Sequence, residues 1–148
     1  IFLVNIIQGE KMFSIKKTLL ILASVPMFLS ATEYQLSTHV LDITSGQPAP
    51  KVKVELYKLE ANQQWKKVSE EFTEENGRIG DLLPYEKAEN RAFGIYKLKF
   101  FTKDYYTSHK INTFYPFVEV SFELSKDQKH YHVPITLSPF GYSTYRGS

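Results

Sequence analysis

Cysteine is absent from the 148 residues of the chain, and charge of one sign is scarce. Without cysteine there are no disulfide bonds, no thiolate nucleophile and no cysteine ligands for a metal ion. The net charge is only +2, and all of this excess lies in residues 1–31, so residues 32–148 are neutral. A neutral chain without a basic run offers no electrostatic footprint for nucleic acid or for an anionic membrane surface. Neither partner is expected.

Long hydrophobic runs are absent as well. A short basic segment, Met12–Lys17, precedes the apolar stretch Thr18–Ser30, and small residues lead up to Ala31. This stretch of about 13 residues falls short of the roughly 20 that cross a bilayer, so a membrane anchor is the less favoured alternative. The pattern predicts an upstream extension and a cleaved signal peptide within residues 1–31, with cleavage near Ala31. We therefore expect export to the periplasm and a single mature domain, residues 32–148.

The mature part shows the alternation of apolar and polar residues that is typical of strands, and hardly any window has the period of an amphipathic helix. Aromatic residues make up 15% of the chain, which also favours strands. One short helix is expected within Asp104–His109. Turn signals such as Asn76-Gly77 separate the strands and favour an all-β sandwich over a barrel. The expected strands are Tyr34–Asp42, Val52–Leu56, Trp65–Phe72, Gly94–Phe101, Val118–Leu124 and Tyr131–Ser138.

All four histidines, His39, His109, His130 and His132, lie in the mature part. The strand period of two places His39 on the less apolar face of its strand, and it places His130 and His132 on one face of another strand. Imidazole can act as a general base or acid near neutral pH, although a strand histidine is more often structural. Three imidazoles could also hold zinc, and this alternative stays open.

Two further features could contribute to a site. Arg78 follows the Asn76-Gly77 turn, from which its side chain could reach across a loop edge into a cleft, or it is a solvated surface charge. Residues 138–148 are rich in aromatic and hydroxyl side chains and include two glycines. A terminal segment of this composition is expected to be ordered against the domain.

Four segments carry a resemblance to a known family. They are Leu36–Asp42 with Gly46–Ala49, Asn76–Arg78, His132–Pro139 and Tyr145–Ser148. With these segments the chain resembles the transthyretin-like 5-hydroxyisourate hydrolases across residues 33–148, with modest departures at Ile135-Thr136-Leu137 and at Phe140. The resemblance implies a prealbumin/transthyretin-like β-sandwich of two four-stranded sheets. It also implies a homotetramer, a dimer of dimers with active sites in a central channel.

The implied reaction is hydrolysis of 5-hydroxyisourate, in which a cyclic amide ring opens during urate degradation. The resemblance implies catalytic roles for His39, Arg78, His132 and Ser148, and substrate binding by His39, Arg78 and Tyr145, without a metal or another cofactor. Either His39 or His132 would activate water while the other orients it or donates a proton. Ser148 would act through its hydroxyl or a terminal carboxylate. No catalytic position of the family matches His130 or His109, which we interpret as structural.

Three rival functions remain at this stage. A non-catalytic carrier like transthyretin would share the fold, but carriers lack the combination of His39, Arg78, His132 and the terminal Tyr-Arg-Gly-Ser. An exported sandwich module for adhesion or envelope assembly would not need this polar set, and fold alone does not determine function. A zinc hydrolase is the third rival.

Overall fold

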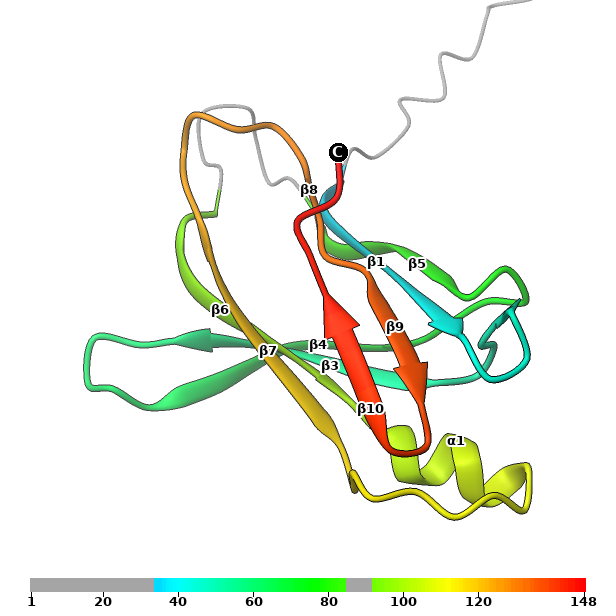
Figure 1. Ribbon diagram of the computed structural model, residues 1–148. Coiled ribbons are helices and arrows are strands. Elements are labelled where there is room, and N and C mark those ends of the chain that lie inside the picture. The colour runs from blue at the N-terminus through cyan, green and yellow to red at the C-terminus, as the bar shows by residue number, and fades with distance from the viewer. Residues whose placement is uncertain (1–33, 85–91) are drawn as a thin grey trace, which may run out of the picture. The chain divides into compact units, whose positions relative to one another are not determined.

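The computed structural model describes residues 34–84 and 92–148 (Figure 1). The predicted extension and signal peptide lie outside these residues. Ten strands and one helix occur in the described part. No helix among these residues is long and apolar enough to cross a membrane.

The first sheet is built around β1, Tyr34–Asp42, which pairs with neighbours along both of its edges (Figure 1). β5 is antiparallel to β1, whereas β8 and β9 run parallel to it. β10 extends the sheet beyond β9, and the two-residue strand β2 pairs with the end of β1. The bounds of these neighbours are β2 Gln47–Pro48, β5 Arg78–Pro84, β8 Tyr131–His132, β9 Ile135–Ser138 and β10 Gly141–Thr144.

The second sheet has four antiparallel strands in the order β4-β3-β6-β7. β6 and β7 alternate between apolar and polar residues, and the predicted strands over β4, β6 and β7 are confirmed, with β6 ending one residue earlier than expected. β3 begins one residue later and ends three residues later than the predicted strand Val52–Leu56. Their bounds are β3 Lys53–Leu59, β4 Trp65–Phe72, β6 Gly94–Phe100 and β7 Val118–Leu124.

The predicted sandwich is confirmed, with differences in the first sheet. Four longer strands form it as expected, and the two-residue strands β2 and β8 join them. The prediction of one strand over Tyr131–Ser138 is wrong, because Val133 and Pro134 interrupt it. Proline has no backbone N–H to donate to a neighbouring strand. The Val133 carbonyl is also engaged outside the ladder, since it accepts from the Thr38 hydroxyl at 2.7 Å.

The core contains buried side chains from both sheets. The residues of β1 that alternate with its polar positions, Leu36 and Val40, are fully buried there. Burial of each such aliphatic side chain contributes about 1.5–3 kcal/mol to stability. The partners from the other strands are Ile79, Leu82, Val54, Leu56, Leu98, Phe100, Val118, Leu124, Ile135 and Leu137.

The single described helix, α1, spans Thr102–Ser108, and Asp104 lies in its first turn as predicted. Its buried face carries Tyr105 and Tyr106. The Tyr105 hydroxyl donates to Asp42 Oδ2 at 3.1 Å and so ties the helix to the end of β1. Burial, and then the charge of Asp42, raise the pKa of Tyr105, so its phenol remains a protonated donor.

The Asn76-Gly77 turn directly precedes β5, which begins at Arg78. Gly77 has a φ of 73°, and its carbonyl accepts from the Val40 N–H at 2.9 Å. A Cβ at this position would lie 2.5 Å from the Val40 carbonyl oxygen and 3.0 Å from Pro48 Cβ. The close approach of the turn to β1 and its positive φ therefore both require glycine.

Replacing Gly77 by alanine should lower the free energy of unfolding by about 2–3 kcal/mol, because strain at φ and overlap with backbone atoms add together. Gly80→Ala is the matched control on β5, since its Cβ would meet nothing within 4 Å. Urea unfolding of both variants measures the difference. Equal stabilities for the two variants would contradict this account of the turn.

Candidate active site

Strand register gathers the predicted site residues on one face of the first sheet. Ser37 and His39 are two positions apart on β1, so their side chains share a face. His39 is the partner of Arg78 on β5, and Ser37 is the partner of His132 on β8. Directly paired residues project to the same side of a sheet. His39, Arg78 and His132 therefore lie together on the face opposite the buried side chain of Leu36.

His39 lies half-buried beside Arg78, and its Nε2 is buried without a hydrogen-bond partner. Only one other buried side-chain polar atom in the described residues shares this condition. Burial lowers the pKa of His39, and the charge of Arg78 lowers it further, against a smaller raising effect from a hydrogen bond with the Asn76 backbone. His39 is therefore neutral at neutral pH, and its buried Nε2 is unsatisfied within the described residues.

His132 has a similar electrostatic setting. Its Nδ1 lies 2.9 Å from Ser37 Oγ. Burial lowers the pKa of His132 most, followed by the charges of Arg78, His130 and His39. A neutral imidazole that keeps its lone pair can take a proton from water, so both histidines suit a general base near pH 7.

The C-terminal segment is ordered against β8 and β9, which confirms the prediction from its composition. The Gly147 N–H donates to the His132 carbonyl at 2.8 Å, and the Thr144 hydroxyl donates to the Pro134 carbonyl at 2.9 Å. A Cβ on Gly147 would lie 2.5 Å from Cδ2 of His132. Only glycine fits against the His132 ring at position 147. Ser148, the next residue, is exposed beside His132.

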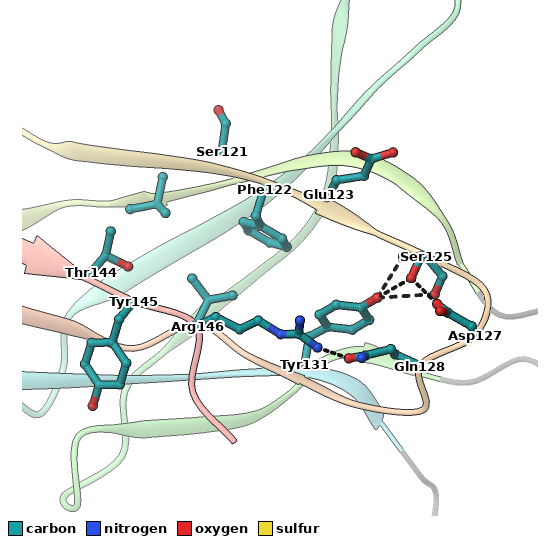
Figure 2. A pocket seen from close by; sticks show the side chains of 12 residues that line it. Ser121, Phe122, Glu123, Ser125, Asp127, Gln128, Tyr131, Thr144, Tyr145 and Arg146 are labelled. Atoms are coloured by element: carbon teal, nitrogen blue, oxygen red, sulfur yellow. Dashed lines mark hydrogen bonds between the residues drawn. The ribbon is translucent and has the colours of Figure 1, made fainter.

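Tyr145 lies in the same segment, but its side chain is 60% exposed. Figure 2 shows its ring directed away from Arg146, whose guanidinium is bonded to Gln128 and covers the Tyr131 ring at 5.5 Å from the centroid. These residues line a pocket of about 560 Å³ between β7 and the C-terminal segment. Tyr145 therefore lines this pocket, whereas His39, Arg78 and His132 are not among its lining residues.

Two pockets in the described part of the chain do not contain the histidine cluster. The pocket of about 560 Å³ and a second one of about 610 Å³ beside α1 are lined by residues other than His39, Arg78 and His132. Arg78 is exposed at the first position of β5. The prediction that its side chain reaches from a loop edge into a cleft stays a prediction.

Sequence reasoning left His130 out of the site, but the structure brings it to the same cluster. Its Nε2 lies 2.9 Å from Ser37 Oγ, and its Nδ1 lies 2.9 Å from the Tyr34 carbonyl oxygen. The spacing of two from His132 was the available signal, but the shared contact with β1 was not visible in sequence. His109 lies elsewhere, at the end of α1, with Nδ1 2.8 Å from the Tyr105 carbonyl oxygen.

Within residues 34–84 and 92–148, no group of three or more His, Cys, Asp or Glu side chains is placed to hold a metal ion.

Comparison with known proteins identifies the family. Residues 36–147 match the sequence model of the HIUase/Transthyretin family. The chain belongs to the HIUase/transthyretin family. A probable 5-hydroxyisourate hydrolase of Caenorhabditis elegans is 45% identical over 113 residues, which are 76% of this chain and 81% of the relative. The 5-hydroxyisourate hydrolase of Salmonella typhimurium is 44% identical over 128 residues, 86% of this chain and 91% of the relative.

Solved structures of family members share the fold. The crystal structure of sea bream transthyretin in complex with thyroxine superposes with a TM-score of 0.70 at 29% identity. The match covers 76% of this chain and 93% of that transthyretin chain. The HIUase/transthyretin family thus includes proteins named as hydrolases and a transthyretin whose structure contains thyroxine. The fold therefore does not distinguish the two functions, and the distinction between them must rest on the side chains of this chain.

The electrostatic coupling in the cluster predicts a measurable titration. Because the positive charge of Arg78 lowers the pKa of His132, Arg78→Gln should raise it, and the same change should raise the pKa of His39. NMR titration of the ring C2 protons measures both values. Lys66→Gln on β4, in the other sheet, is the control and should leave both unchanged. Unaltered pKa values in Arg78→Gln would show that the guanidinium does not act on the imidazoles.

Proposed function

We propose that this chain hydrolyses 5-hydroxyisourate, opening a cyclic amide ring to give 2-oxo-4-hydroxy-4-carboxy-5-ureidoimidazoline in urate degradation. The observation that carries the proposal is the convergence of His39, Arg78 and His132 on one face of β1. Relatives named as 5-hydroxyisourate hydrolases support it at 44–45% identity over most of their length.

Hydrolysis of the ring requires attack of water on a carbonyl carbon. A base must take a proton from the water, donors must stabilise the oxyanion, and an acid must protonate the leaving nitrogen. Burial and Arg78 lower the pKa of both His39 and His132, so both start as neutral imidazoles. One of them takes the proton from water, and the imidazolium that forms is the acid that protonates the leaving nitrogen. Arg78 supplies a planar, permanently charged donor fork for the substrate oxygens.

The C-terminal segment contributes polar groups beside the imidazoles. Gly147 is bonded to the backbone of His132, which places Ser148 close to the cluster. The Ser148 hydroxyl extends the polar network there, and the exposed Tyr145 hydroxyl binds substrate. Because the Tyr145 side chain is 60% exposed within its own chain, its contact with substrate depends on a site formed with a second copy.

A carrier function is the second candidate. The thyroxine complex of sea bream transthyretin favours it at the level of the fold. Two observations favour the hydrolase instead. The relatives named as hydrolases are more similar to this chain, and the first sheet presents an arginine with two neutral histidines rather than an apolar lining.

We also propose a homotetramer arranged as a dimer of dimers. Two observations support assembly: the histidine cluster lies on an open sheet face, and large aromatic side chains such as Phe114, Phe140 and Tyr142 are exposed. A monomer rarely exposes such side chains together without an interaction partner. Sedimentation equilibrium should give four times the mass of the chain, and a monomer at all concentrations would rule the tetramer out.

Residues 12–31 lead us to propose export through a signal peptide and action in the periplasm. The basic start, the apolar stretch and the small residues near Ala31 support this. Fractionation of a bacterial host expressing the chain, with amino-terminal sequencing, tests it. Periplasmic protein that begins near residue 32 is the expected result, and uncleaved cytoplasmic protein would contradict the proposal.

The activity is tested with freshly prepared 5-hydroxyisourate, generated by urate oxidase and followed by ultraviolet absorbance. The purified chain should accelerate the decay, and a chelator should leave the rate unchanged if the reaction uses side chains alone. Loss of rate with the chelator would direct attention to the zinc alternative. Decay at the spontaneous rate would contradict the hydrolase and favour the carrier.

Arg78→Lys should lower kcat/KM by about 100-fold or more while the fold persists, because lysine keeps the charge but loses the planar fork. The absorbance assay measures this loss, and circular dichroism confirms the fold. Lys66→Arg, an exchange of the same kind on β4, is the control. Near wild-type kcat/KM for Arg78→Lys would remove Arg78 from the catalytic assignment.

Gly147→Ala should lower kcat/KM by about tenfold, roughly 1.4 kcal/mol of transition-state stabilisation. The added methyl group must displace either the His132 ring or the C-terminal segment. Gly141→Ala is the matched control, because its Cβ would make an ordinary contact of 3.6 Å with Ser138. If both variants are fully active, the contact of the segment with His132 is not needed for turnover.

A further inference from the structure

Two imidazoles share a single hydroxyl in the cluster. Ser37 Oγ lies 2.9 Å from Nε2 of His130 and 2.9 Å from Nδ1 of His132. The other nitrogen of His130, Nδ1, lies 2.9 Å from the Tyr34 carbonyl oxygen. These contacts form one continuous chain of hydrogen bonds from the Tyr34 backbone to the ring of His132.

The Tyr34 carbonyl oxygen can only accept a hydrogen bond, and this determines which atom donates in each of the other hydrogen bonds of the series. His130 Nδ1 must therefore carry a hydrogen, and Nε2 is an acceptor whenever the ring holds no second proton. The single hydrogen of the Ser37 hydroxyl must point to His130 Nε2, since otherwise two lone pairs would face each other at hydrogen-bond distance. Ser37 Oγ is then left to accept from His132, so His132 Nδ1 is the donor.

We infer that Ser37 and His130 are positioning residues that fix His132 as the tautomer with hydrogen on Nδ1 and a free lone pair on Nε2. The inference rests on the proposed function, because it selects which histidine activates water. His132 Nε2 is the base, and His39 lies outside this series of hydrogen bonds. The charged and titratable groups that face His132 are Arg78, His130 and His39.

In this mechanism His132 takes a proton from water and later returns it. Its Nε2 lone pair takes a proton from water, the water oxygen bonds to the carbonyl carbon, and the carbonyl electron pair moves onto oxygen. The resulting imidazolium keeps its Nδ1–H bond to Ser37, which steadies the charge. When the ring C–N bond breaks, Nε2 returns the proton to the leaving nitrogen, and His132 is neutral again with the same tautomer.

A purely structural serine makes a different prediction. A structural hydroxyl would anchor β8 to β1, and its loss would lower stability without choosing a ring nitrogen. A positioning hydroxyl affects the ring itself: without it, Nδ1 of His132 loses its side-chain acceptor and keeps only the hydrogen bond of the ring with the Ser37 backbone. A share of the rings then carries the hydrogen on Nε2, where it blocks the base. The tautomer of His132 therefore separates the two roles.

The first measurement is kcat/KM of the purified full chain and its variants in the 5-hydroxyisourate assay. Ser37→Ala and His130→Phe should each lower kcat/KM by about tenfold, mainly through kcat, while Ser37→Thr, which keeps the hydroxyl, should stay within about threefold of wild type. Ser69→Ala is the matched control, since Ser69 is a part-buried strand serine of the other sheet whose hydroxyl bonds to the Leu82 carbonyl at 2.8 Å. Wild-type kcat/KM in Ser37→Ala, or no rescue by threonine, would overturn the inference.

The second measurement reads the rings directly, through two-bond proton–nitrogen NMR correlations of nitrogen-15 histidine in the same proteins at about pH 8. Wild type should show His130 and His132 with hydrogen on Nδ1, and Ser37→Ala should move the hydrogen of His132 towards Nε2. Hydrogen on Nε2 of His132 in wild type would overturn the inference. If wild type does not hydrolyse 5-hydroxyisourate, the proposed function is wrong, while the spectra still decide whether Ser37 and His130 set the tautomer.

Discussion

Backbone pairing along both edges of β1 is the interaction on which the site depends. Antiparallel pairing with β5 places Arg78 opposite His39, and parallel pairing with β8 places His132 opposite Ser37. The side-chain period of a strand is two, so a slip of one residue in either pairing would turn the functional side chains into the core. The buried partners on the other face of β1, Leu36 and Val40, make such a slip costly, so the hydrophobic core also specifies the register of the polar cluster.

Much of the fold could be predicted from local patterns, because most strands bury one face only and so alternate in sequence. The short helix was also predicted, although it begins two residues earlier than expected. β5 was not predicted, since Gly80 and Asp81 interrupt the alternation, and its strand conformation depends on pairing with β1. The break at Pro134 was missed for the related reason that Val133 and Pro134 are buried like strand residues but satisfy their carbonyls through threonine hydroxyls, Thr38 and Thr144.

The site could also be predicted only in part from the sequence. The resemblance selected His39, Arg78 and His132, and the structure brings these three together, while their catalytic roles stay predictions. It could not include His130, because the contact with Ser37 joins residues 93 positions apart. Nor could it show that the cluster lies on an open face away from the pocket beside Tyr145. A sandwich shared with a hormone-binding relative can thus serve another chemistry, through the polar residues that β1, β5 and β8 turn outward.

The parallel pairing of β1 with β8 and β9 has a consequence for biogenesis. Ser37 and His132 are separated by 95 positions, so β1 emerges from the ribosome long before its partners on that edge. Non-local pairing of this kind gives a high contact order and slow folding, and leaves the first strand exposed in the meantime. His39 and Arg78 can meet as soon as β5 is synthesised, whereas His132 arrives only with the last strands. The cluster is therefore among the last features to form, and only a completely synthesised chain can assemble it.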